Sequence, residues 1–315
     1  MALVRLFSAV CCLIYCCTAY SQSHNASAYE HLANVSVQKE HILFLTGGET
    51  AGRACGSRGA FVAKEYIEKK FEEYGVSKRG ILYYQPFKEK NVTGYNVIGE
   101  ISAYPASNEY VIIGAHYDHL GTIKGKVYPG ADDNASGVTA LLELGRMFGQ
   151  MKKDGKYPSK NILFVAFDGK ELSMAGSRNF LKGMRIHPNN IICMINMDQI
   201  GSTLAPPHEK ENYLLVLGRD SLKQWAAERI DLCNRTAHLG IDIDYTFYDS
   251  ENFYKLFYRL SDHHPFAQKG IPALFFTSGI TNLTYKEEDT EDKINYPVLT
   301  NRIKLIYHFV YHLVN

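Results

Sequence analysis

The feature that most constrains the fold is a regular alternation, starting near residue 58, of short apolar segments with segments of helical spacing. The apolar segments are rich in β-branched and aromatic residues and are predicted to be strands: 95–101, 110–114, 161–167, 191–197, 213–217 and 272–277. The helical segments are 58–74, 137–151, 220–234 and 297–314. Strands that are apolar throughout are buried on both faces. The pattern therefore predicts an α/β fold with a largely parallel sheet covered by helices on both sides.

The first residues of the chain differ from the rest. Arg5 supplies one positive charge, residues 6–19 are nearly all apolar, and Ala19-Tyr20-Ser21 has the small-x-small pattern of a cleavage site. This predicts a signal peptide at residues 1–21, a single domain at 22–315, and a secreted or periplasmic protein without a membrane anchor after cleavage. A lipid anchor on one of the early cysteines stays open, although the bulky Tyr15 precedes Cys16.

The net charge and the cysteines argue against a nucleic-acid-binding protein and against a cysteine-based metal site. The net charge is +1, so the chain lacks the basic excess that is typical of nucleic-acid-binding proteins. Cys55, Cys193 and Cys233 follow the predicted signal peptide, and an odd number allows at most one disulfide. Their spacing offers no cysteine-based zinc site, and Cys193 lies in an apolar run where burial is expected.

Residues that bind metals follow the predicted strands. His116 and Asp118 come after strand 110–114, Glu171 comes after 161–167, and Asp198 comes directly after 191–197. A further acidic pair, Asp132-Asp133, precedes the helix that begins at residue 137. Ligands bind beyond the carboxyl ends of parallel strands, so these side chains are expected to meet. Imidazole and carboxylate together suit zinc.

The same residues fall in motifs that resemble a known family, the co-catalytic dizinc aminopeptidases of the secreted bacterial leucine-aminopeptidase type, whose relatives include glutamate carboxypeptidase II and the glutaminyl cyclases. The resemblance covers residues 52–315. Its markers are Gly114-Ala115-His116-Tyr117-Asp118, 130–137, Lys170-Glu171, Asn196-Met197-Asp198, 261–266 and Asp289-Thr290. It implies a three-layer α/β/α sandwich with a mostly parallel, mixed central sheet, and a zinc-dependent release of N-terminal residues from peptides.

The resemblance also implies roles for single residues. One zinc would be held by His116 and Asp198, and Asp133 would bridge to a second zinc that also binds Glu171. Asp118 would orient His116, with Asp132 beside the ligands. Tyr258 matches a tyrosine that resembles an oxyanion donor.

Two positions depart from the family pattern. Lys170 stands where the family has the glutamate that acts as general base, and Tyr285 stands where it has a histidine ligand. The three carboxylate ligands and Lys170 together carry a net negative charge, which one Zn²⁺ ion neutralises. Two Zn²⁺ ions would leave the site with an excess of positive charge. We therefore expect one zinc, on His116, Asp133 and Asp198. Replacement of the missing ligand by His263 or His264, or of the base by Asp168, stays open.

Three functions are compatible with these residues. The first is a secreted zinc exopeptidase with impaired or altered catalysis, acting on peptides. The second is a non-hydrolytic peptide-binding protein, favoured by Lys170 and Tyr285. The third is a transferase that resembles the glutaminyl cyclases. The aromatic residues of segment 245–257 form either a substrate pocket or, as burial statistics favour, part of the core.

Overall fold

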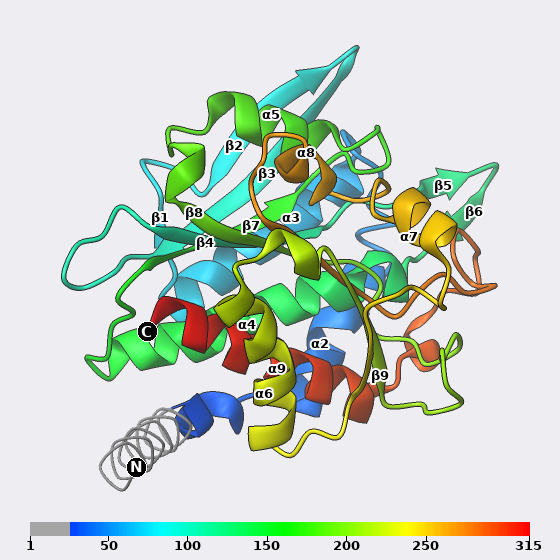
Figure 1. Cartoon of the computed structure of the whole chain (residues 1–315). Coiled ribbons are helices and arrows are strands. Elements are labelled where there is room, and N and C mark those ends of the chain that lie inside the picture. The colour runs from blue at the N-terminus through cyan, green and yellow to red at the C-terminus, as the bar shows by residue number, and fades with distance from the viewer. Residues whose placement is uncertain (1–25) are drawn as a thin grey trace, which may run out of the picture.

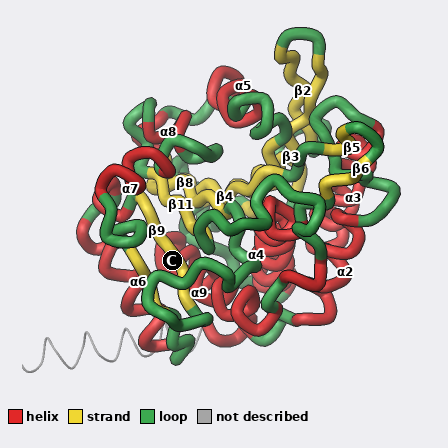
Figure 2. The backbone as a smooth tube through the Cα atoms, turned by 90° about the vertical axis from the view of Figure 1, so that its right-hand side faces the viewer, coloured by secondary structure: helices red, strands yellow, loops and turns green. Residues whose placement is uncertain are grey.

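A computed structural model describes residues 26–315; the predicted signal peptide lies outside them. The described chain is a three-layer α/β/α sandwich with a mixed central sheet, as predicted (Figure 1). The view in Figure 2 shows helices α5 (Ala175–Gly183) and α8 (His264–Ala267) on one side of the strands, and α4 (Gly137–Lys153) and α9 (Tyr296–Val314) on the other.

The central sheet has the strand order β1-β3-β7-β4-β8-β11-β9-β10, with β2 paired to β3. Neighbours are parallel from β7 through β4 and β8 to β11, so these strands end at the same edge. β3 and β9 run against them. The strands are β1 (Ser77–Lys78), β2 (Tyr84–Glu89), β3 (Val92–Ile101), β4 (Tyr110–His116), β7 (Asn161–Phe167), β8 (Ile191–Met197), β9 (Tyr213–Leu217), β10 (Asp242–Asp244) and β11 (Ala273–Thr277), and a separate hairpin contains β5 (Gly121–Ile123) and β6 (Lys126–Tyr128).

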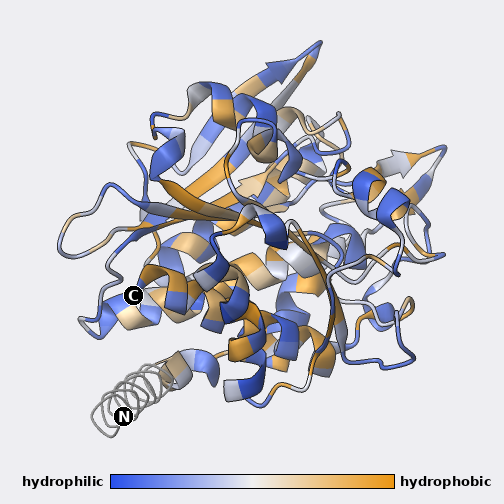
Figure 3. Cartoon of the chain, viewed as in Figure 1, coloured by the Kyte–Doolittle hydropathy of each residue, from blue (hydrophilic) through white to orange (hydrophobic). Residues whose placement is uncertain are grey.

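The central strands are apolar throughout because each face packs in a different core. In β7, Phe164 and Ala166 belong to the core under α4 and α9, while Leu163 and Val165 belong to the core under α5 and α8. Figure 3 shows the apolar strands enclosed by helices whose outer surfaces are polar. Burial on both faces fixes the strand register, and with it the height at which each strand ends.

The predicted elements agree with the structure where the apolar pattern is strong. α3 (Arg58–Tyr74) has the predicted bounds, because Ser57 caps its first turn and Gly75, with a φ of 82°, ends it. α6 (Gln224–Thr236) begins four residues later than predicted. α2 (Val35–Thr46) and α7 (Glu251–Phe257) were not predicted: α2 lies in a segment without a clear pattern, and α7 in a segment interpreted as loop.

Cysteine and membrane predictions can be compared with the described residues. Cys55, Cys193 and Cys233 are all free thiols, so no disulfide forms among residues 26–315. Cys193 is buried, as expected. No helix within residues 26–315 combines the length and the apolar character that crossing a membrane requires.

A buried arginine joins the loops around the sheet edge. Arg53 donates to the carbonyl oxygens of Tyr117 at 2.7 Å, Leu45 at 2.6 Å, Pro129 at 2.5 Å and Gly130 at 2.9 Å. Its side chain is fully buried. These bonds tie the loop after β4 to the loop before α4.

We expect Arg53→Met to lower the free energy of unfolding by about 3 kcal/mol or more, because each buried carbonyl left without a donor costs about 1–3 kcal/mol. Urea unfolding followed by circular dichroism measures the change. Arg178→Met is the control, because Arg178 is half-exposed and pairs only with Glu89 at the surface. If the two variants were equally stable, water molecules would be replacing the hydrogen bonds that Arg53 donates to the carbonyl oxygens.

Candidate metal centre

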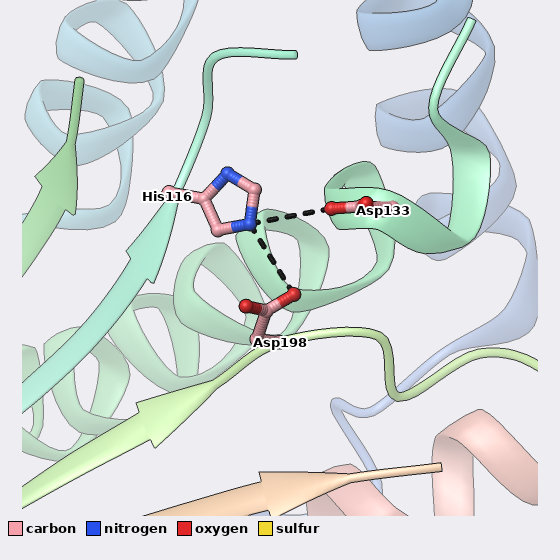
Figure 4. A group of neighbouring side chains, drawn as sticks. All are labelled: His116, Asp133 and Asp198. Atoms are coloured by element: carbon pink, nitrogen blue, oxygen red, sulfur yellow. Dashed lines mark ion pairs between the residues drawn. The ribbon is translucent and has the colours of Figure 1, made fainter. Parts of the chain in front are cut away.

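Three parallel strands bring the predicted ligands to one edge of the sheet. His116 is the last residue of β4, Asp198 follows β8, and Glu171 lies in the turn after β7. Asp133 comes from the irregular helical turn Ala131–Ser136 that precedes α4. Figure 4 shows His116, Asp133 and Asp198 pointing toward one another.

The first ligand group consists of His116, Asp133 and Asp198. The His116 Nε2 atom lies 3.2 Å from Asp198 Oδ1 and 3.4 Å from Asp133 Oδ1. All three side chains are buried, and none of these three atoms has a hydrogen-bond partner among the described residues. Buried polar atoms normally have a partner, so this group is suited to a cation. One nitrogen and two carboxylate oxygens are ligands that zinc accepts.

Neighbouring groups fix the ligands in orientation. The His116 Nδ1 atom lies 3.0 Å from the carbonyl oxygen of Asp118, which leaves Nε2 facing the carboxylates. The hydroxyl of Ser261 donates to Asp198 Oδ2 at 2.6 Å, so Oδ1 faces His116. Asn196 in turn donates to the hydroxyl of Ser261.

Asp118, which we expected to orient His116 through its carboxylate, has a second set of contacts. Its carboxylate lies 3.7 Å from His116 Nδ1 and instead accepts the backbone N–H groups of Lys170 and Glu171, at 3.0 and 3.1 Å. The backbone carbonyl of Asp118 therefore orients the histidine, and its carboxylate holds the turn after β7. Two backbone N–H groups offer a carboxylate a better partner than a ring nitrogen that already lies against a carbonyl oxygen.

Asp132 and Asp289 position the loops around Asp133. The Asp132 carboxylate accepts the backbone N–H groups of Gly201 and Ser202, at 2.7 and 3.1 Å. The Asp289 carboxylate accepts those of Asp132 and Asp133, at 2.8 and 3.0 Å. Asp132 therefore lies beside the ligands, as predicted, but its side chain holds backbone.

Asn134 was missed from the sequence. Its amide nitrogen donates to the carbonyl oxygens of His116 and Met197, and its amide oxygen accepts the N–H groups of Gly137 and Gln199. One side chain therefore ties together the ends of β4 and β8 and the start of α4. These long-range bonds join segments that are far apart in the chain, so they had no signal in the sequence.

A second ligand group consists of His119, Asp133 and Glu171, so Asp133 is shared between both. Lys170 enters this group: its ammonium nitrogen lies 2.9 Å from Glu171 Oε1 and 3.8 Å from Asp133 Oδ1. It also donates to the hydroxyl of Tyr285 at 3.4 Å. The two residues that depart from the family pattern are therefore in contact with each other.

The electrostatics show that the cluster attracts positive charge. Burial alone would lower the pKa of Lys170, but the carboxylates of Asp133, Asp198 and Glu171 hold it well above its usual value. Burial alone would lower the pKa of His116 too, but the carboxylates of Asp198, Asp118 and Asp133 together raise it well above its usual value. Burial lowers the pKa of His119 to about 4, so this imidazole is neutral. Lys170 therefore carries a positive charge among these carboxylates.

Tyr258 and the three residues left open as replacements, His263, His264 and Asp168, have other contacts in the structure. The hydroxyl of Tyr258 donates to the carbonyl of Ala273, so it is not free to stabilise an oxyanion at the cluster. His263 bonds to the carbonyl of Tyr258 and stacks on Phe275, and neither it nor His264 joins a ligand group of the described chain. Asp168 turns away and accepts the N–H groups of Tyr95 and Gly169.

A cavity of about 100 Å³ adjoins the cluster. Its lining includes Lys170, Asp198 and Tyr285 together with the apolar side chains of Phe247, Phe257, Leu260, Phe275 and Ile280. A larger cavity of about 530 Å³ lies beyond Tyr117 and Asp168 and contains none of the residues of the ligand groups. Of these two cavities, the smaller one is lined by a residue of the first ligand group, Asp198.

Together, the α/β/α sandwich and the histidine–carboxylate cluster at the ends of its parallel strands define the class of α/β/α proteins with a candidate metal centre at the sheet edge. Residues 96–310, more than half of the chain, match the model of peptidase family M28. The chain belongs to this family, which confirms the predicted family resemblance.

Curated relatives and solved structures show related folds with different printed activities. A probable zinc metalloprotease of Pyrenophora tritici-repentis is 29% identical over 47% of this chain and 36% of its own length. A glutaminyl-peptide cyclotransferase of Boiga irregularis is 23% identical over 82% of this chain and 77% of its own. The LapA aminopeptidase of Legionella pneumophila has a TM-score of 0.71 at 19% identity, over 92% of this chain and 75% of its own. The chain spans about a third of the length of the first relatives that it matches.

Proposed function

We propose that the chain is a zinc-dependent exopeptidase that removes N-terminal residues from peptides, using one zinc on His116, Asp133 and Asp198. The observation that carries this proposal is the set of three converging, buried atoms without hydrogen-bond partners in the described chain. The names of relatives described as zinc metalloproteases and aminopeptidases support it. The position of the Lys170 ammonium beside Glu171 supports one zinc rather than two.

The residues around the zinc suggest how a peptide bond would be hydrolysed. When bound, zinc supplies a Lewis acid that polarises the carbonyl group and lowers the pKa of water. Glu171 is the nearby carboxylate outside the first ligand group, and burial raises its pKa, which suits a general base. The Lys170 ammonium, 2.9 Å away, supplies positive charge where an oxyanion develops. In this proposal Glu171 replaces the missing glutamate as base.

The adjoining cavity favours an apolar side chain in the substrate. Phe247 and Phe257 stack at 4.5 Å between ring centroids, and both line the cavity. Phe247 also belongs to a small buried core. The aromatic segment therefore serves both as core and as pocket lining.

Export is part of the same proposal. The predicted signal peptide at residues 1–21 supports a secreted or periplasmic location, where the substrates are extracytoplasmic peptides. The near-neutral net charge supports neither a nucleic-acid nor a membrane partner.

The experiment is a hydrolysis assay on dipeptides with leucine, lysine or glutamate at the N-terminus. We expect leucine to be preferred over the charged residues by about 10-fold or more, because burying an apolar side chain contributes about 1.5–3 kcal/mol. Removal of metal with a chelator should abolish turnover and zinc should restore it. A leucine peptide with an acetylated N-terminus is the control for exopeptidase action. Cleavage of this acetylated peptide at an equal rate would contradict aminopeptidase specificity.

Two other functions have specific support. Lys170 in place of a base favours a non-hydrolytic peptide-binding protein, in which peptides bind but are not cleaved at any zinc concentration. The cyclotransferase relative that matches 82% of the chain favours a transferase. Formation of pyroglutamate from a peptide with N-terminal glutamine would identify that activity.

A further inference from the structure

His119 is a buried histidine without an assigned role. It lies in the loop after β4 and is 1% exposed. Neither ring nitrogen has a hydrogen-bond partner among residues 26–315. Its Nδ1 atom lies 3.9 Å from Asp133 Oδ2, on the side of this carboxylate that does not face His116.

A buried imidazole without hydrogen bonds is stabilised by a group that binds its nitrogen atoms. A buried nitrogen that gives up its bonds to water costs free energy unless another group replaces them. Imidazole nitrogens are common ligands of metal ions. The nearest possible co-ligands of this imidazole, Asp133 and Glu171, offer oxygen atoms within 4.8 Å of each other and of the ring nitrogen.

Tyr285 occupies the place where the family pattern has a histidine, and it lies against His119. The two rings stack with centroids 6.2 Å apart and an interplanar angle of 28°. Tyr285 offers no nitrogen of its own, and the imidazole of His119, from the loop after β4, lies beside it.

We infer that His119, Asp133 and Glu171 form a second metal position, and that the Lys170 ammonium occupies it until a second metal displaces it. The ammonium nitrogen already contacts two of the three ligands, at 2.9 Å from Glu171 and 3.8 Å from Asp133. A divalent ion and an ammonium cannot share these oxygens, because like charges a few ångströms apart repel by several kcal/mol. The second metal therefore binds much more weakly than the first.

This inference rests on the proposed function only for the first zinc, and metal binding tests it without any substrate. Zinc binding to the metal-free full chain is measured by calorimetry, and bound Co²⁺ is followed by its visible absorption. We expect the wild type to bind one ion tightly and a second ion at least about 100-fold more weakly, as the repulsion by Lys170 requires.

The variants separate the roles of Lys170 and His119. Lys170→Gln removes the ammonium and should tighten the second ion at least about 10-fold, because removing a repulsion of about 1.4 kcal/mol already gives this factor. The double variant Lys170→Gln with His119→Phe should lose the increased affinity for the second ion. The control double variant, Lys170→Gln with His264→Gln, should keep this affinity, because His264 is a half-exposed histidine of α8. His119→Phe alone should leave the first ion unchanged.

The outcomes are distinct. Phenylalanine fits the same space and removes two unpaired nitrogens, so thermal unfolding should show a folded His119→Phe variant. If the folded double variant keeps the second ion as tightly as Lys170→Gln does, His119 is not a ligand and the inference fails. If no peptide is cleaved but His119→Phe removes the second ion, the metal position stands and only the proposed peptidase function fails.

Discussion

Asp133→Asn is expected to abolish zinc binding and to lower kcat/KM for peptide hydrolysis about 10³-fold or more, as expected when a catalytic metal is lost. Asp133 is the only residue common to both ligand groups of the described chain. Asparagine keeps the size of the side chain but removes its negative charge. The backbone should stay in place, because Asp289 holds it through the N–H groups of residues 132 and 133.

Asp262→Asn is the matched control for this experiment. Asp262 is also fully buried and also has two carboxylate oxygens without partners in the described chain, but it belongs to neither ligand group. Zinc content, measured by elemental analysis after dialysis, should be unchanged in this control. An Asp133→Asn variant that retained the zinc content and kcat/KM of the wild type would exclude the cluster as the catalytic metal site.

The sequence predicted the first ligand group because its signal is one of topology. His116 and Asp198 of this group each follow an apolar run, as Glu171 of the second group does, and parallel strands buried on both faces end at one edge. Lys170 was also assigned to the site from the sequence, and the ammonium lies among the carboxylates as its charge requires. The strand ends indicated where the residues would meet, whereas the position of Lys170 and the roles of the ligands came from the family resemblance.

Side chains whose role depends on loop conformation were not predictable. Tyr258 matched a motif by spacing, but α7 ends beside it and directs its hydroxyl to the carbonyl of Ala273. His119 lies three residues after His116, outside any regular element, and only the path of that loop turns it toward Asp133. Asn134 bonds to residues more than sixty positions away, which no local pattern encodes.

Lys170→Glu is expected to give two bound zinc ions per chain and to raise kcat for leucine peptides about 10-fold or more, since a positioned general base contributes about 10²–10⁴-fold. The substitution removes the ammonium from Glu171 and adds a carboxylate beside the ligands. Four carboxylates then balance two Zn²⁺ ions, whereas the wild-type cluster balances one. Elemental analysis and steady-state kinetics measure the two effects separately.

Comparison with Lys170→Gln distinguishes the metal from the base. Both substitutions remove the positive charge, so both should admit a second ion, but only glutamate can accept a proton. A gain in kcat that appears in both variants would come from the second metal. A gain confined to Lys170→Glu would come from the restored base and would imply that Glu171 serves poorly as base in the wild type. If Lys170→Glu still binds only one zinc, the ammonium does not exclude the second ion, and the charge argument for a one-zinc site is wrong.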